Sequence, residues 1–119
     1  MATQIASRLP LHIDEAEFSD PTLVVSGENW ALAVTCPWRI TSRSVVEVSW
    51  TSKDAVDRVW DLIGQTIVAI RDEGRDPIFD LSGGAQLEIF SDTDTDPWVL
   101  RFEGQTFVGP LRVRDDEQS

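Results

Sequence analysis

Residues 21–34, PTLVVSGENWALAV, decide the fold class because they join two alternating apolar runs through one short turn. Trp30, Leu32 and Val34 recur at every second position, which is typical of a β-strand with one buried face. Residues 26–29, Ser-Gly-Glu-Asn, are turn formers. The stretch therefore predicts an antiparallel hairpin with these three side chains on one face.

The same alternation continues on both sides of this hairpin. The apolar members of three further runs are Leu9, Leu11 and Ile13; Trp38 and Ile40; and Val46, Val48 and Trp50. Each set is expected on the inward face of its own strand, so the first half of the chain predicts a meander of short antiparallel strands.

The pattern changes to a helical one at residues 52–63. Apolar residues at i, i+3, i+4 and i+7 form one stripe: Val56, Val59, Trp60 and Ile63. Thr51 with Asp54 resembles a capping box, Asp54 and Arg58 form an i,i+4 pair, and Gly64 suits a C-cap. A single α-helix is expected here, with the stripe against the core.

Strand patterns resume after the helix. In residues 76–90, pairing Phe79 with Leu87 leaves a three-residue loop, Ser82-Gly83-Gly84. Residues 97–102 place Trp98, Leu100 and Phe102 inward, and residues 105–113 form a last strand or edge that Pro110 stops. The predicted fold is α+β: a largely antiparallel, strongly curved sheet of about 7–9 short strands packed on one α-helix.

Length and composition indicate a single domain spanning 1–119, with a core at about 9–113 and a frayed acidic tail at 115–119. No apolar run approaches the ~20 residues needed to cross a bilayer, and the N-terminus lacks the pattern of a secretion signal. The lone Cys36 cannot form an internal disulfide. These features predict a cytoplasmic protein.

Charge is the most unbalanced property of the chain. Twenty-one Asp and Glu residues against ten Lys and Arg give a formal net charge of −11. Such a surface repels phosphate backbones and anionic lipids, which disfavours nucleic-acid and membrane binding. It favours a basic protein partner, although acidity also serves solubility alone.

Residues 90–98, FSDTDTDPW, approach the spacing of a calcium-binding loop. Asp92, Asp94 and Asp96 alternate and Glu103 follows, but Pro97 stands where that loop needs glycine. The flanking patterns also predict strands where the motif requires helices. We therefore interpret this stretch as an acidic turn between two strands and expect no metal or other cofactor.

No other residues form a recognisable catalytic set. His12 and Cys36 are the only residues of their kinds, and His12 is expected to face solvent while Cys36 is buried. Asp80 and Glu88 fall diagonally on one face of a predicted hairpin, as chance allows in so acidic a chain. A non-enzymatic protein is the favoured interpretation.

All five tryptophans lie in the apolar phase of their elements, which predicts core packing. Trp38 and Trp98, each directly after a turn proline, are the alternatives for anchoring a partner.

The order of these features resembles that of known small bacterial domains. GENWALAVTCPWRI, a helix leading into LIGQTIVAI, and FDLSGGAQLEIFSDTDTDPWVLRF resemble actinobacterial-type domains of unknown function, over roughly residues 22–110. Such families are similar to immunity proteins of toxin systems. The resemblance implies a single α+β domain without established catalytic residues, so it assigns no site.

The leading hypothesis is a protein-interaction module, in its narrowest form an acidic immunity-type inhibitor of a basic partner. Asp92, Asp94, Asp96, Trp98 and Glu103 are the predicted partner-binding residues. Two alternatives stay open: a small ligand-binding domain or enzyme with a pocket in the curved sheet, and a homo-oligomer joined through a sheet edge.

Overall fold

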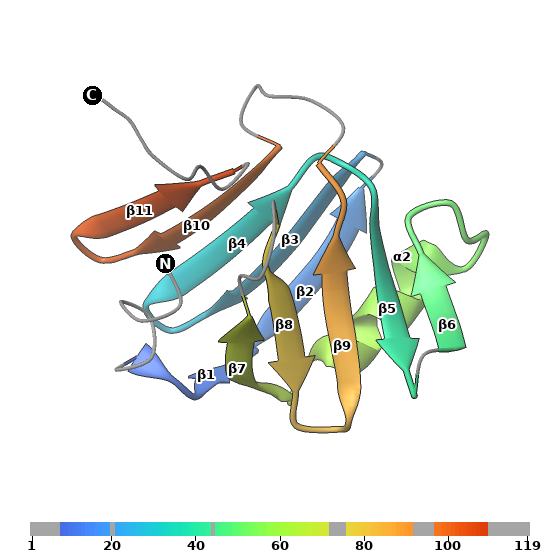
Figure 1. Cartoon of the computed structure of the whole chain (residues 1–119), viewed down its shortest axis with the longest axis horizontal. Coiled ribbons are helices and arrows are strands. Elements are labelled where there is room, and N and C mark those ends of the chain that lie inside the picture. The colour runs from blue at the N-terminus through green and yellow to red at the C-terminus, as the bar shows by residue number, and fades with distance from the viewer. Residues whose placement is uncertain (1–7, 20, 44, 72–75, 92–96, 110–119) are drawn as a thin grey trace.

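The computed structural model describes residues 8–19, 21–43, 45–71, 76–91 and 97–109, which form two antiparallel β-sheets and one short helix (Figure 1). Successive side chains of a strand point to opposite faces, so the alternating sequence gives each sheet one apolar face. The two apolar faces pack against each other and enclose the core.

The five-stranded sheet is built around the hairpin of residues 22–34. Its strand order is β11-β10-β4-β3-β2, with every neighbouring pair antiparallel. The strands are β2 (Glu15–Ser19), β3 (Thr22–Gly27), β4 (Trp30–Val34), β10 (Trp98–Phe102) and β11 (Gln105–Val108). Trp30, Leu32 and Val34 are all buried, which confirms the phase expected for this hairpin.

The six-stranded sheet has the order β1-β7-β8-β9-β5-β6. Its strands are β1 (Leu11–His12), β5 (Trp38–Ser42), β6 (Val45–Ser49), β7 (Thr66–Arg71), β8 (Ile78–Leu81) and β9 (Ala85–Ile89). Phe79 lies opposite Leu87, so the predicted hairpin register is confirmed. Gly84 in its loop has φ of 91°, a conformation that glycine adopts without strain.

The expectation of a single curved sheet is wrong. The described residues form eleven strands in two sheets, whereas the sequence predicted about 7–9 in one. The chain changes sheets between β1 and β2, between β4 and β5, and again between β9 and β10, and the last two crossings lie side by side. There the Thr35 amide donates to the Pro97 carbonyl at 2.9 Å, and the Phe90 amide donates to the Pro37 carbonyl at 2.8 Å. Alternation along a strand does not reveal such crossings.

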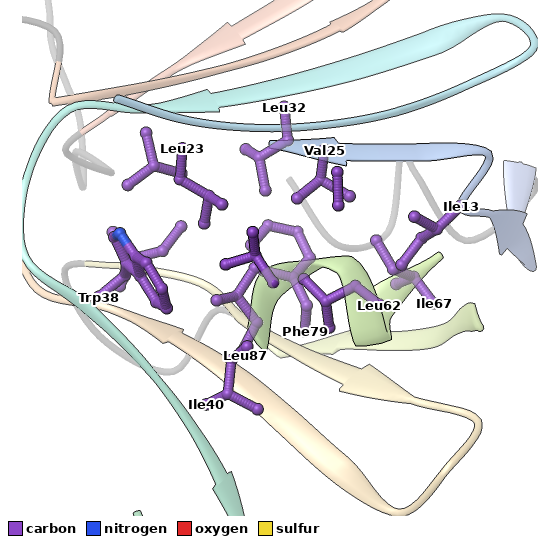
Figure 2. Packing of buried hydrophobic residues seen from close by; sticks show 14 of the residues in the cluster. Ile13, Leu23, Val25, Leu32, Trp38, Ile40, Leu62, Ile67, Phe79 and Leu87 are labelled. Carbon is purple, nitrogen blue, oxygen red and sulfur yellow. The ribbon is translucent and has the colours of Figure 1, made fainter. Parts of the chain in front are cut away.

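Core side chains from both sheets meet in the space between them (Figure 2). Leu23, Val25 and Leu32 of the five-stranded sheet face Phe79 and Leu87 of the other (Figure 2). The rings of Phe18 and Trp38 also join the sheets, edge to face, with their centroids 5.3 Å apart. Cys36 is buried among these residues, as the sequence predicted.

The helix is shorter than predicted and turns a different face to the core. It begins at Ala55 rather than at residue 52, with α2 (Ala55–Arg58) continuing as the 3₁₀ turn η2 (Val59–Leu62). Gly64, with φ of 92°, follows its end as expected. In a 3₁₀ turn residues i and i+3 eclipse, so Leu62 lies above Val59 and takes the core position that an α-helix would give to Ile63.

The predicted stripe is therefore divided between the core and the surface. Ala55, Val59 and Leu62 are buried, and Leu62 points between the sheets (Figure 2). Of the predicted stripe, Val59 alone is buried, whereas Val56, Trp60 and Ile63 are exposed.

A β-bulge explains a second difference from the sequence prediction. Val46, Val48 and Trp50 were expected on one inward face, but Val46 and Trp50 are exposed. Opposite β6, Ile40 pairs with Val48 while Thr41 pairs with Val46, so the β6 strand contains one extra residue. The extra residue reverses the phase of alternation, and Trp50 lies beyond the end of the strand.

Candidate functional site

The acidic stretch that the sequence singled out follows β9 of the six-stranded sheet and precedes β10 of the five-stranded sheet in the chain. Asp92, Asp94 and Asp96 fall outside the described residues. The strands on either side of them are not partners: β9 pairs with β5 and β8, whereas β10 pairs with β4 and β11. The stretch therefore joins two strands, as the sequence predicted, but these strands belong to different sheets and do not form a hairpin.

Trp98, the predicted anchor beside that stretch, is a core residue. It is 1% exposed, and its indole Nε1 donates to Oδ1 of Asp76 at 3.2 Å. The same carboxylate accepts hydrogen bonds from the Ser91 amide, at 2.8 Å, and from the Ser91 hydroxyl. Gly109 packs so closely that a Cβ there would come within 1.9 Å of the indole nitrogen. Trp98 thus presents no surface to a partner.

Glu103 is the other predicted site residue that the structure describes. It is exposed in the turn between β10 and β11, where Phe102 pairs with Gln105. Trp98 occupies the opposite end of β10, so the structure does not bring these two residues together. Glu103 lies instead in a hollow that it shares with Glu28 and Asn29 of the β3–β4 turn.

Two acidic residues considered for acid–base chemistry are engaged in ion pairs. Asp80 accepts from Nε and Nη2 of Arg71 at 3.2 and 3.1 Å. Glu88 accepts from Nε of Arg39 at 2.5 Å and from the Thr41 hydroxyl at 3.3 Å. Each carboxylate therefore has a cross-strand cationic partner, which satisfies it structurally.

The histidine and the cysteine occupy different settings. His12 is exposed at β1, with Nδ1 3.2 Å from the Thr66 hydroxyl, whereas Cys36 is buried in the link from β4 to β5. Within the ranges that the structure describes, no three His, Cys, Asp or Glu side chains form a group able to hold a metal ion.

The exposed side of the helix is the first surface with the character of a binding site. We call Val56, Trp60 and Ile63 the outer helix face; their exposed fractions are 51%, 60% and 46%. Val56 and Trp60 are four residues apart, and the 3₁₀ turn then places Ile63 above Trp60. Trp60 is thus flanked by aliphatic side chains on the solvent side of the helix.

Acidic residues dominate the polar positions of the same helix. Arg58 lies 3.5 Å from Asp54, 3.6 Å from Asp61 and 4.0 Å from Glu47, so its single charge is shared among three acids. Asp57 on the helix is exposed as well. Counting Lys53 as a second cation, these residues carry an excess of two negative charges.

The apolar area of Trp60 is large enough to matter in binding. With 60% of the side chain exposed, and a tryptophan surface of roughly 250 Å², about 150 Å² stays accessible. Covering that area stabilises a complex by about 4 kcal/mol before the costs of association are subtracted. Tryptophan is also among the residues that most often dominate binding energy at protein interfaces.

A groove at the other end of the molecule is the second candidate surface. It has a volume of about 490 Å³, and its lining residues are Arg8, Pro10, Leu11, His12, Asp14, Glu28, Asn29, Trp30 and Phe102. A neighbouring hollow of about 430 Å³ shares four of these residues and adds Arg101 and Glu103. In Figure 1 the contributing segments, β1 and the turns after β3 and β10, gather at the left end of the drawing.

Tertiary contacts form the groove. The indole Nε1 of Trp30 donates to the carbonyl of His12 at 3.1 Å, which fastens β1 to the β3–β4 hairpin. Gly27 permits this approach, since a Cβ there would lie 2.2 Å from both atoms. Sequence patterns missed this groove because its lining comes from three separate segments of the chain, none of which carries a motif.

The comparisons with known proteins add no assignment. No family model matches the chain, and neither a curated protein nor a solved structure shows significant similarity to it. In the described part of the chain, no helix has both the length and the apolar character that crossing a bilayer requires.

Proposed function

We propose that this protein is a non-enzymatic interaction module whose outer helix face binds a basic protein partner. The observation that carries the proposal is Trp60, 60% exposed between Val56 and Ile63 on a helix whose polar neighbours are mainly acidic. Apolar contact supplies the affinity, and the surrounding carboxylates select a partner that presents Lys or Arg around an apolar side chain.

Charge favours a basic partner over a second copy of the chain. Each copy carries a formal charge of −11, and association through the outer helix face would bring like-charged carboxylates together. A basic partner instead gains from the same field, because long-range attraction raises the rate of encounter.

The immunity-type role suggested by the sequence resemblance is the narrowest form of this proposal. An inhibitor of a basic toxin must cover a cationic surface, and an acidic rim around an apolar anchor suits that task. In this form the protein acts in the cytoplasm of the cell that makes the toxin, and the acidic stretch 92–96 adds charge to the encounter.

A matched pair of variants tests the proposal. Val56 and Val68 are both exposed, at 51% and 48%, but Val56 lies on the outer helix face and Val68 on β7. Val56→Arg and Val68→Arg change the net charge equally, so they differ in position alone. Wild type and both variants are immobilised, exposed to extract of the native cell, and the retained proteins are identified.

The expected result is one basic protein that wild type and Val68→Arg retain and Val56→Arg loses. Its association rate should fall steeply as salt rises, since screening shortens the reach of the attraction. Retention of the same proteins by both variants would contradict the proposal. Light scattering that shows a wild-type dimer, dissociated by Val56→Arg, would assign the face to a second copy instead.

A further inference from the structure

The groove lined by Arg8, His12 and Trp30 shares no residue with the outer helix face and has a chemistry of its own. Its volume of about 490 Å³ falls in the range of small-molecule sites, roughly 300–1,000 Å³. The lining includes the rings of Trp30 and Phe102, which are 7% and 4% exposed, while Asp14, Glu28 and Asn29 supply oxygen acceptors. This combination of aromatic rings and carboxylates suits an organic cation.

One cation already occupies part of this surface. The guanidinium carbon of Arg8 lies 4.6 Å from the centroid of the Phe102 ring. Its Nη2 donates to Oε1 of Gln105 at 3.4 Å. The groove therefore accommodates a guanidinium group over Phe102, held by a cation–π contact and a long hydrogen bond in an exposed setting.

The carboxylates of the groove are not used by that arginine. Asp14 and Glu28 are exposed, and the described residues give neither side chain an ion pair within 4.0 Å. Against the single charge of Arg8 they leave the groove with an excess of one negative charge when His12 is neutral. An incoming cation thus finds acceptors with which no described cation pairs.

We infer that this groove binds the guanidinium group of an arginine-like ligand. The ligand's N–H groups donate to the carboxylates of Asp14 and Glu28, and its planar cation lies against the aromatic surface that Arg8 partly covers. Arg8 competes with the ligand for Phe102, so the chain contains its own weak inhibitor of the site.

The test uses N-acetyl-arginine amide as the probe and the neutral N-acetyl-citrulline amide, of nearly the same shape, as its control. Binding is followed in ¹H–¹⁵N spectra of the full chain through the indole N–H signal of Trp30, which bonds to His12 beside the groove. The arginine probe should shift this signal saturably, with a dissociation constant of about 1 mM or tighter, while the citrulline probe does not.

Matched variants locate the site. Glu28→Gln should weaken binding roughly two- to fivefold, whereas Glu17→Gln, the same change at an exposed position of β2, should not. Arg8→Ala should strengthen binding by a similar factor, more than Lys53→Ala, which removes an equal charge from a position outside the groove.

Three results would overturn the inference. These are equal shifts with both probes, equal affinities of Glu28→Gln and Glu17→Gln, and an unchanged affinity after Arg8→Ala. Equal response to N-acetyl-lysine amide would instead contradict the preference for guanidinium. None of these outcomes bears on the outer helix face, because the probe experiment involves no protein partner.

Discussion

The indole nitrogen of Trp98 lies 3.2 Å from Oδ1 of Asp76, and this hydrogen bond connects the first residue of β10 to the segment that precedes β8. Since β8 and β10 belong to different sheets, one side chain of intermediate exposure joins the two layers. Ser91, two residues after the end of β9, donates its backbone N–H to the same carboxylate. Asp76 therefore holds both ends of the acidic connection in place.

We expect Asp76→Ala to destabilise the fold by about 2 kcal/mol, because it removes charge-assisted hydrogen bonds and leaves the buried Trp98 N–H without its acceptor. Chemical denaturation measures the loss. Asp57→Ala, which removes an exposed carboxylate from the helix, is the control and should change the free energy of unfolding by less than about 0.5 kcal/mol. Equal effects of the two substitutions would show that Asp76 has no structural role.

Trp38 and Trp98 form a second matched pair. Both are 1% exposed, but among the described residues the indole N–H of Trp38 is the buried side-chain donor without a hydrogen-bond partner. Trp98→Phe breaks a hydrogen bond, whereas Trp38→Phe removes an unsatisfied donor and loses packing alone. Trp98→Phe should therefore cost about 1–2 kcal/mol more than Trp38→Phe in the free energy of unfolding. A larger cost for Trp38→Phe than for Trp98→Phe would mean that the hydrogen bond between Trp98 and Asp76 contributes nothing to stability.

The 3₁₀ turn predicts that truncating two neighbouring residues destabilises the fold to very different extents. Leu62 is 2% exposed and Ile63 is 46% exposed. Leu62→Ala should destabilise the fold by about 2–4 kcal/mol through the cavity it leaves, and Ile63→Ala by less than about 1 kcal/mol. Thermal or chemical unfolding of the two variants decides the point. If Ile63→Ala destabilised the fold more than Leu62→Ala, the result would support the regular α-helix that the sequence pattern indicated.

Substitutions on the outer helix face should leave the fold intact. Trp60→Ala removes a side chain that is mostly in solvent, so the free energy of unfolding should change by less than about 1 kcal/mol. Partner binding should nevertheless fall at least tenfold, which corresponds to about 1.4 kcal/mol. Unfolding curves and binding measurements on one preparation separate the two effects. If Trp60→Ala bound the partner as tightly as wild type, Trp60 would not be part of the interface.

Much of the candidate site lay beyond sequence reasoning. The outer helix face was visible as a stripe, but the expected α-helix assigned it to the core, because an apolar stripe by itself does not reveal a change to 3₁₀ geometry. The groove had no local signal, since its walls come from β1 and two hairpin turns. Glu103 was selected for its spacing from the aspartates, and the structure places it instead in a turn beside that groove.

The sequence by itself determined most of the strands and their inward faces, with β6 and its bulge as the exception. Trp30, Leu32 and Val34, and likewise Phe79 opposite Leu87, lie where period-two alternation and the turn glycines placed them. This succeeds because the side of a strand on which a residue lies depends on its own backbone, which neighbouring residues specify.

Only the tertiary structure decided how the strands divide into two sheets. Pairing joins β4 to β10, more than sixty residues apart, and separates β9 from β10, which are adjacent in the chain. Such choices depend on the total burial achieved by competing arrangements of strands with similar apolar faces, a quantity that no local segment contains. The same global packing buries Val59 and Leu62 and leaves Trp60 in solvent.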